Sequence, residues 1–356
     1  MAENKKFNAW LPNFGAKGWG ITIACFIFFY FYSFWNAATN TLFGLFNEMY
    51  GWQQTDMSYV ITIAGWISLI AVVLFGTLGR KIGAKMVSVI GLAGSAIGFA
   101  VLACAHTFEV FAAGVVIFNF SMVAYATIGV GLLGSSWFPR TKGAFMGIAT
   151  MGMTISSATL NPIILGFAGS AFGISGFFWA MAAVVAITAV VVFLFVKNNP
   201  EEAGAYPDND QSVSREELEA EFKAALEYKK TSPWTTARVL KTPQTWLIGL
   251  GTGLPMMVGA GTIALLVPTL ASYGQDPMFG VVLLSSMWPI GLLGHYLIGV
   301  LDQKIGTKKT TLVVICVLGI GGLLVKLGGV NSVVCAVATG MFMFGLSGAA
   351  NVCMSL

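Results

Sequence analysis

The chain has 356 residues, of which 56% are hydrophobic and only 10% are charged, and its net charge is +4. Soluble domains carry about 25% charged residues, so this composition excludes a soluble surface and favours a membrane protein. The net charge is too small to indicate nucleic-acid binding. Five cysteines lie in apolar runs without metal-ligand spacing, a pattern typical of buried thiols.

Ten apolar stretches follow one another along the chain, each close to or above the roughly 20 residues that cross about 30 Å of hydrocarbon. Lipid offers the backbone no hydrogen-bond partners, so runs of this length are expected to be helices. The sequence therefore predicts an all-α polytopic membrane protein. The expected spans are residues 19–46, 57–79, 86–105, 109–136, 144–168, 174–196, 244–272, 279–301, 310–328 and 332–356.

Lysines and arginines are distributed unevenly between the two sides that ten alternating spans define. All of the 19 except Lys326 precede the first span or follow an even-numbered one. Cationic loops are retained in the cytoplasm, so the N-terminus and the central loop are expected to be cytoplasmic, in the plasma membrane. The same asymmetry supports the span count, because a miscounted span would scramble it.

The longest connector, residues 197–243, is the one polar part of the chain. Ser214 and Glu217 have the spacing of a capping box, which predicts the start of a short surface helix. The connector is interpreted as a hinge between two bundles, with a regulatory interaction site as the alternative. The expected domains are an N-terminal bundle of residues 1–196, this linker, and a C-terminal bundle of residues 244–356.

One loop is repeated in the two halves. GTLGRKIGAK at 76–85 returns as GVLDQKIGTK at 299–308, each time between the second and third span of its half. A parallel duplication of this kind is typical of transporters whose halves rock about a central site. The residues expected to act in this loop during the conformational change are Gly76, Arg80, Lys81, Gly83, Lys85, Gly299, Asp302, Lys304, Gly306 and Lys308.

Both copies resemble the loop signature of the major facilitator superfamily, Gly-x-Leu-x-Asp-Arg/Lys-x-Gly-x-Arg/Lys. The usual Asp of that signature is Arg80 in the first copy and Gln303 in the second, where Asp302 stands one place earlier. The resemblance implies a charge network that stabilises the outward-facing state through this Asp, and its replacement by Arg80 puts that network in doubt.

Two further stretches are similar to particular branches of that family. SSWFPRTKGAFMGI at 135–148 resembles the turn of the oxalate/formate antiporter and monocarboxylate transporter branches, and GISGFFW at 173–179 keeps part of the usual start of the sixth span. The resemblance implies a facilitator-type two-bundle fold of twelve helices, of which ten are visible. Two more helices are therefore expected beyond residue 356.

The resemblance implies that the first, fourth, seventh and tenth helices line a central cavity. In the first span Tyr32, Asn36 and Asn40 are spaced i, i+4 and i+8, which places them on one helical face. Polar groups on such a face cost energy in lipid unless they meet protein or water, and hydrogen bonding between helices is the alternative role. The full expected substrate-binding set is Tyr32, Asn36, Asn40, Asn119, Tyr125, Thr262, His295 and Asn351.

No nucleotide-binding loop, catalytic set or metal-ligand spacing is readable, so the sequence predicts neither an enzyme nor a cofactor. It predicts a secondary active transporter of a small solute in the lipid bilayer, working by alternating access, with a coupling ion or counter-substrate as a further partner. The branch resemblance points to an organic anion or carboxylate. The alternatives are an exporter or importer of a larger amphipathic solute, such as a steroid acid or drug, and a non-transporting membrane sensor.

Overall fold

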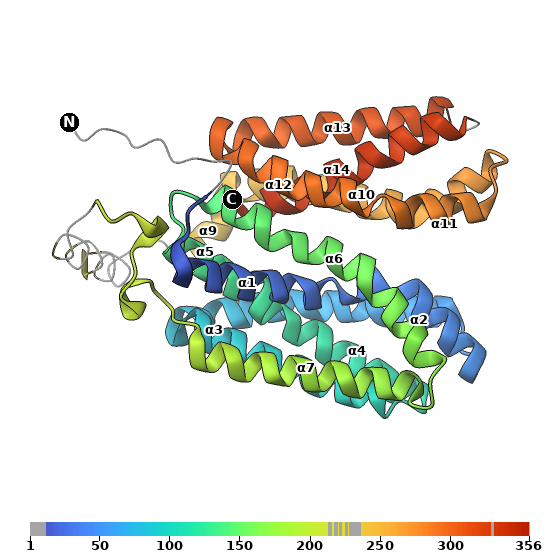
Figure 1. Ribbon diagram of the computed structural model, residues 1–356, viewed down its shortest axis with the longest axis horizontal. Helices are drawn as coiled ribbons and strands as arrows, with labels where there is room; N and C mark the ends of the chain where they lie inside the picture. Colours follow the sequence, from blue (N-terminus) through green and yellow to red (C-terminus); the bar gives the residue numbers. More distant parts are fainter. Residues whose placement is uncertain are drawn as a thin grey trace. The chain divides into compact units, whose positions relative to one another are not determined.

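The computed structural model describes residues 12–212, 216, 220, 223–224, 227, 236–328 and 331–355. Within them the chain is almost entirely helical, without a β-strand, as the composition predicted. The longer elements in Figure 1 are α1 (Gly15–Tyr32), α2 (Phe34–Tyr50), α3 (Gln54–Ala103), α4 (Phe108–Val123), the π-helix η1 (Ala124–Gly129), α5 (Val130–Trp137), α6 (Lys142–Ala168) and α7 (Gly173–Phe195).

The later part of the chain begins with two short turns, η2 (Glu201–Ala203) and η3 (Pro207–Asn209). After them come α9 (Thr236–Lys241), α10 (Pro243–Ser272), α11 (Pro277–Ser286), α12 (Trp288–Ile305), α13 (Thr307–Gly328) and α14 (Ser332–Ser355). The predicted linker helix that starts near Ser214 lies largely outside the described residues.

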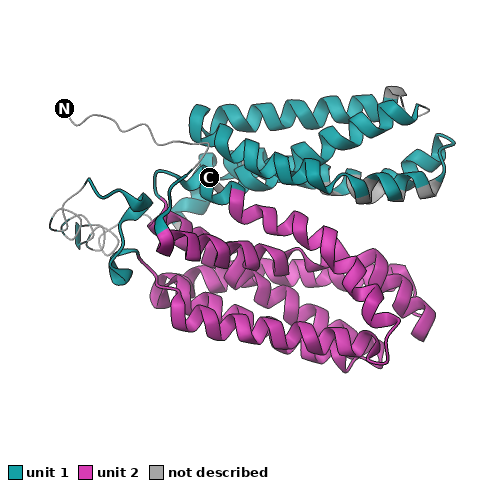
Figure 2. Cartoon of the chain, viewed as in Figure 1, with its two compact units in different colours: residues 1–15, 139–147, 200–356 teal, residues 16–138, 148–199 magenta. Residues whose placement is uncertain are grey.

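The chain forms two compact units, coloured separately in Figure 2. One, unit 2, holds residues 16–138 and 148–199. The other, unit 1, holds residues 1–15, 139–147 and 200–356. The division at 1–196, 197–243 and 244–356 stays a prediction.

Unit 2 has an aromatic core where α3, α4 and α7 pack together. Phe34 is fully buried, and its ring centre lies 4.9 Å from that of Phe99 and 5.7 Å from that of Phe118. Phe178 of α7 is 6.3 Å away. Ring pairs at these spacings add to the burial of apolar area, so the polar groups of this unit are held by a rigid interior.

In unit 1, α14 packs against both α12 and α13. Its core includes Ile298, Val314, Leu318 and Phe342, each at most 5% exposed. Residues on the opposite faces of these helices remain exposed and apolar, for example Leu323 at 59%. That distribution is the one expected of helices that meet lipid on one face.

Seven stretches of the described chain have the length and apolarity of membrane spans. Residues 57–79 and 86–105, expected as two spans, both lie in α3, whose 50 residues comprise two helices that meet at Gly83, where φ is 85°. At about 1.5 Å per residue, α3 is long enough for both crossings. A Cβ at Gly79 would lie 3.6 Å from Val87, eight residues further on, so the chain reverses at Gly83 and the two expected spans are separate helices joined by a tight turn.

Three other expected spans depart locally from regular α-helix. The first divides at Ser33 into α1 and α2, and the fourth contains η1. The eighth divides at Met287 into α11 and α12, because Pro289 lacks the N–H that a continuous helix would use. The first and fourth remain single apolar stretches of membrane-spanning length, Gly15–Tyr50 and Phe108–Trp137, so the expected spans hold there and only the local hydrogen bonding differs.

Candidate functional site

The first group of expected site residues lies on α2. The side chains of Asn36 and Asn40 are exposed, and among the described residues neither makes a hydrogen bond. Tyr32 is only partly exposed and lies at the end of α1, on the other side of the break at Ser33. Asn36 and Asn40 therefore present free amide donors and acceptors, which a lipid-facing position would leave unsatisfied.

Polar pairs that were not predicted join α1 and α2 to α6. The Thr41 hydroxyl donates to Asn161 Oδ1 at 2.8 Å, and the hydroxyls of Tyr30 and Thr159 are 2.9 Å apart. All four side chains are partly buried. Asn161 precedes Pro162 inside α6; an Asn-Pro pair within a span is the sequence signal that marks this position.

Asn119 and Tyr125 lie inside the bundle and not with the exposed asparagines. Asn119 is 5% exposed; its Nδ2 donates to the Val115 carbonyl of its own helix, and its carbonyl accepts from Ser68. Tyr125 is fully buried, with its ring edge-on to Phe28 at 5.6 Å. Both contacts are those of residues that fix helix packing.

Tyr125 lies in η1, six residues of π-helix between α4 and α5. π-Helical turns are rare and frequent at functional sites. The Tyr125 hydroxyl lies beside Ser95 of α3 without a well-formed hydrogen bond, and Tyr32 is close enough to interact with it electrostatically. Through Phe28, Tyr125 thus packs against α1 within unit 2.

In unit 1 the expected site residues fall in two places. Thr262 of α10 lines an open hollow of about 320 Å³, together with Leu266, Thr269 and Val325. His295 and Asn351 lie elsewhere, where Asn351 Nδ2 donates to the His295 carbonyl at 3.2 Å. They are 2% and 0% exposed respectively.

The first copy of the repeated loop is tied to the end of the same half. Asn198, which sequence reasoning missed, accepts a hydrogen bond from the Lys85 backbone N–H at 2.9 Å. Its amide fills the space beside Gly83, where a Cβ would be 2.5 Å from Oδ1. Lys85 Nζ also lies 4.8 Å above the ring of Phe193. Asn198 therefore caps the second half of α3, which begins at the turn.

In the second copy, Gly306 has φ 81° and ends α12. Asp302 is 7% exposed and lies near the Lys142 ammonium, which it attracts. Gln303 Nε2 donates to the Arg140 carbonyl at 2.6 Å. The two residues at and before the usual Asp position thus contact the start of α6.

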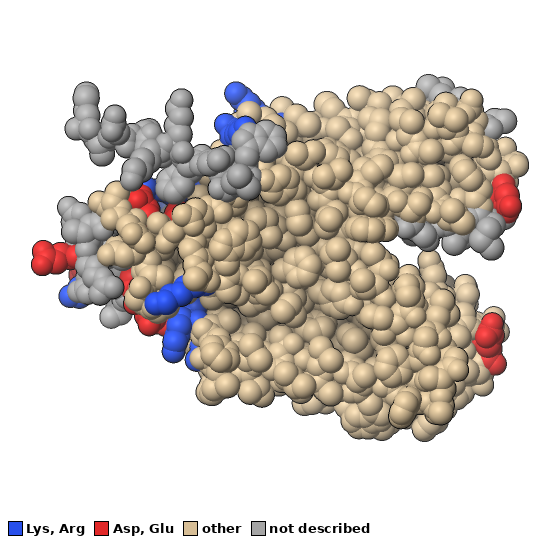
Figure 3. All heavy atoms as spheres, in the orientation of Figure 1, with Lys and Arg blue, Asp and Glu red and all other residues tan. Residues whose placement is uncertain are grey.

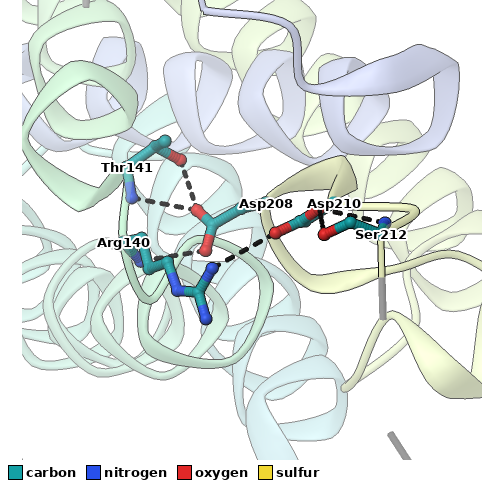
Figure 4. Close-up of polar contacts among 5 residues, drawn as sticks. All are labelled: Arg140, Thr141, Asp208, Asp210 and Ser212. Carbon is teal, nitrogen blue, oxygen red and sulfur yellow. Dashed lines mark hydrogen bonds and ion pairs between the residues drawn. The ribbon is translucent and has the colours of Figure 1, made fainter. Parts of the chain in front are cut away.

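That start of α6 is also held by the linker, through contacts drawn in Figure 4. Asp208 is 4% exposed; it accepts from the backbone N–H groups of Arg140 and Thr141, both at 2.9 Å, and from the Thr141 hydroxyl at 2.6 Å. Asp210 binds Arg140 Nη1 at 3.2 Å. We call residues 140, 141, 208 and 210 the linker clasp. It places an anion where the helix dipole favours one.

Among the expected loop residues, Gly76 lies on α3 facing Ile128, and Gly299 lies against α6. Arg80, Lys81, Lys304 and Lys308 are exposed. On the face drawn in Figure 3, the described lysines and arginines gather at helix ends, while the middles of the helices carry no charged side chain.

The chain was compared with known proteins. No curated protein matches it in sequence. In fold it is similar to the proton:xylose symporter XylE bound to 6-bromo-6-deoxy-D-glucose, with TM-score 0.71 and 12% identity over 95% of this chain and 81% of that one. It is also similar to the fucose:proton symporter FucP of E. coli, with TM-score 0.67 and 14% identity over 96% and 89% of the two chains.

The family model described as Major Facilitator Superfamily matches residues 21–356. This match covers nearly the whole chain, and the two similar structures are transporters of that fold. The protein is thus a multi-pass membrane transporter by family rather than an enzyme. The chain belongs to the Major Facilitator Superfamily.

Proposed function

We propose that this protein is a secondary active transporter that moves a small organic anion, of the mono- or dicarboxylate class, across the plasma membrane by alternating access. The positive-inside distribution of Lys and Arg supports a cytoplasmic N-terminus and central linker. The resemblance of residues 135–148 to the oxalate/formate and monocarboxylate branches supports the substrate class.

The observation that carries the proposal is the pair of exposed amides at Asn36 and Asn40. They stand on a membrane helix of a transporter fold, and no described residue satisfies them. An amide N–H₂ donates two hydrogen bonds, which suits the oxygens of a carboxylate. These donors therefore offer recognition of an anion without a fixed positive charge in the span.

A larger amphipathic solute is the second candidate, supported by the hollow on α10 and α13. Met257, Val258, Leu266 and Val325 make it mostly apolar, and Thr262 and Thr269 add two hydroxyls. Sites for such ligands are mostly apolar with a few polar groups.

The test is counterflow with the whole protein in proteoliposomes, using labelled formate, oxalate, lactate and acetate, with xylose and a bile acid as comparison solutes. Asn36→Ala and Asn40→Ala are expected to raise the half-saturation concentration about tenfold each, the loss of roughly one hydrogen bond to a charged group. Asn47→Ala is the matched control, because Asn47 is exposed on the same helix but donates to the Trp52 carbonyl.

Counterflow of a carboxylate, weakened only at Asn36 and Asn40, supports the proposal. Counterflow of the bile acid alone favours the second candidate. A protein that binds a solute but shows no counterflow for any of them would be a sensor and would contradict transport.

A further inference from the structure

α6 and α12 touch through glycines within unit 1. A Cβ at Gly147 would lie 2.8 Å from the His295 carbonyl and 3.1 Å from Gly299 Cα, and a Cβ at Gly299 would lie 2.8 Å from the Gly143 carbonyl. Only glycine permits backbones this close. We call this contact of Gly143, Gly147, His295 and Gly299 the glycine crossing.

Three residues at the crossing or beside it each have a buried polar atom without a partner among the described residues: His295 Nδ1, Asn351 Oδ1 and Asp302 Oδ1. These residues are 2%, 0% and 7% exposed. Buried polar groups in proteins are nearly always hydrogen-bonded, so each of these atoms has room for a further polar partner such as water or a proton. The Asn351 amide sits between the two helices, because its Nδ2 also lies 3.0 Å from the Cβ position of Gly299.

The charges around His295 come from few elements. On α12 itself the acid is Asp302, seven residues away, about 10 Å along the axis. The charged residue at the start of α6 is Lys142, which attracts Asp302. The sequences of α11 and α14 contain no charged residue. The charged residues of α13 are Lys308, Lys309 and Lys326, all exposed. No described acid therefore stands beside the imidazole to hold it charged.

His295 is consequently neutral while the glycine crossing is closed, since an imidazolium there would lose its hydration without gaining a counter-ion. In the neutral tautomer with hydrogen on Nε2, Nδ1 carries the free lone pair and is the nitrogen that takes a proton.

We propose that His295 is a proton-binding site which is empty when the glycine crossing is closed and fills when the crossing loosens and admits water. A hydronium ion gives its proton to Nδ1 and leaves as water. Because binding and conformation are linked, a proton on His295 in turn favours the loosened crossing. The role of His295 in coupling rests on the proposed function, whereas proton binding by His295 does not depend on it.

The test uses the fact that the chain has two histidines, His106 and His295. In ¹⁵N-histidine-labelled protein in nanodiscs, His106→Asn leaves one imidazole signal. In that background the signal should stay neutral between about pH 5 and 8. Gly147→Leu, which forces the crossing apart, should make it titrate within that range, and Gly147→Ala serves if the larger side chain prevents folding.

Gly166→Leu is the matched control, because Gly166 lies on the same helix with open space around it. Its imidazole signal should stay neutral, as in the parent protein. A neutral signal in the Gly147 variants would overturn the proposal, and so would equal titration in all the proteins. Neither result depends on transport.

A second arm measures coupling, with a carboxylate that shows counterflow. His295→Gln should abolish accumulation driven by a proton gradient and keep counterflow. Unchanged gradient-driven accumulation would overturn the coupling role. Absence of counterflow in the parent protein would instead contradict the proposed function, while the imidazole titration would still decide whether His295 is a proton-binding site.

Discussion

The buried carboxylate of Asp208 accepts two hydrogen bonds from Thr141, one from its backbone N–H at 2.9 Å and one from its hydroxyl at 2.6 Å. Asp208 stands in the left-handed region with φ 53°, which Asp tolerates better than most residues. A residue 67 positions away in sequence thus supplies the cap at the start of α6 that the local sequence does not.

Asp208→Ala should loosen the linker clasp. Hydrogen bonds to a charged group contribute about 1.5–3 kcal/mol each, so the substitution is expected to lower the midpoint of thermal unfolding and to speed proteolysis within residues 200–212. Asp210→Ala is the control: it removes an ion pair with the 65% exposed side chain of Arg140, worth at most about 1 kcal/mol, and two exposed local hydrogen bonds from Ser212, but leaves Asp208 at the start of α6. Equal sensitivity of the two variants would contradict the assignment.

Gly83→Ala should be more damaging than Gly306→Ala. Both glycines have positive φ, 85° and 81°, so both substitutions cost about 1–2 kcal/mol of backbone strain. Only at Gly83 would the new Cβ also meet a side chain, Asn198 at 2.5 Å, whereas nothing lies within 4 Å at Gly306. Unfolding midpoints of the two variants in detergent measure the difference, and a larger loss at Gly306 would refute it.

Glu201→Gln should stabilise the protein at neutral pH and have no effect in acid. Burial raises the pKa of the Glu201 carboxyl above its ordinary 4.5, and the charge of Glu202 adds to this. The folded state therefore favours the protonated form, and the stability this contributes is lost as pH rises through the raised pKa.

Thermal midpoints of Glu201→Gln and the parent protein should therefore coincide in acid, separate as pH rises from the ordinary pKa of 4.5 through the raised pKa, and keep a constant offset above it. The comparison variant is Glu202→Gln at the exposed neighbour, which removes the smaller, electrostatic cause of the raised pKa but leaves Glu201 buried, so its midpoint should change less. A constant offset of Glu201→Gln at every pH would show that the effect is not electrostatic.

Membrane-impermeant maleimide should label native Cys104 in intact cells, because this exposed thiol follows α3 at the end opposite the cationic loops. In a Cys104→Ser and Cys316→Ser background, Ser212→Cys should react only after the membrane is opened. Labelling of Ser212→Cys from outside would reverse the orientation inferred from the lysines and arginines.

The sequence by itself determined the membrane class, the helical content and the family. Apolar length is a local property, so span after span could be read along the chain. The repeat of 76–85 at 299–308 is also visible as plain sequence, and it led to the superfamily that the family model confirms. Asn36 and Asn40 are both exposed, as expected of residues four positions apart on one helix. The break at Ser33, which separates Tyr32 from them, was not predicted.

Only the tertiary structure decided which polar groups meet. Asn198 at Gly83, Asp208 at Thr141 and Asn351 at His295 are partners separated by 56 residues or more. Helical periodicity reports which face a residue occupies but not which helix packs against it. The same limit applies to Asn119 and Tyr125, which were expected in the site together with the exposed asparagines yet are buried. Packing of distant helices, set by close contacts such as those of Gly147 and Gly299, decides which polar side chains are free for a ligand.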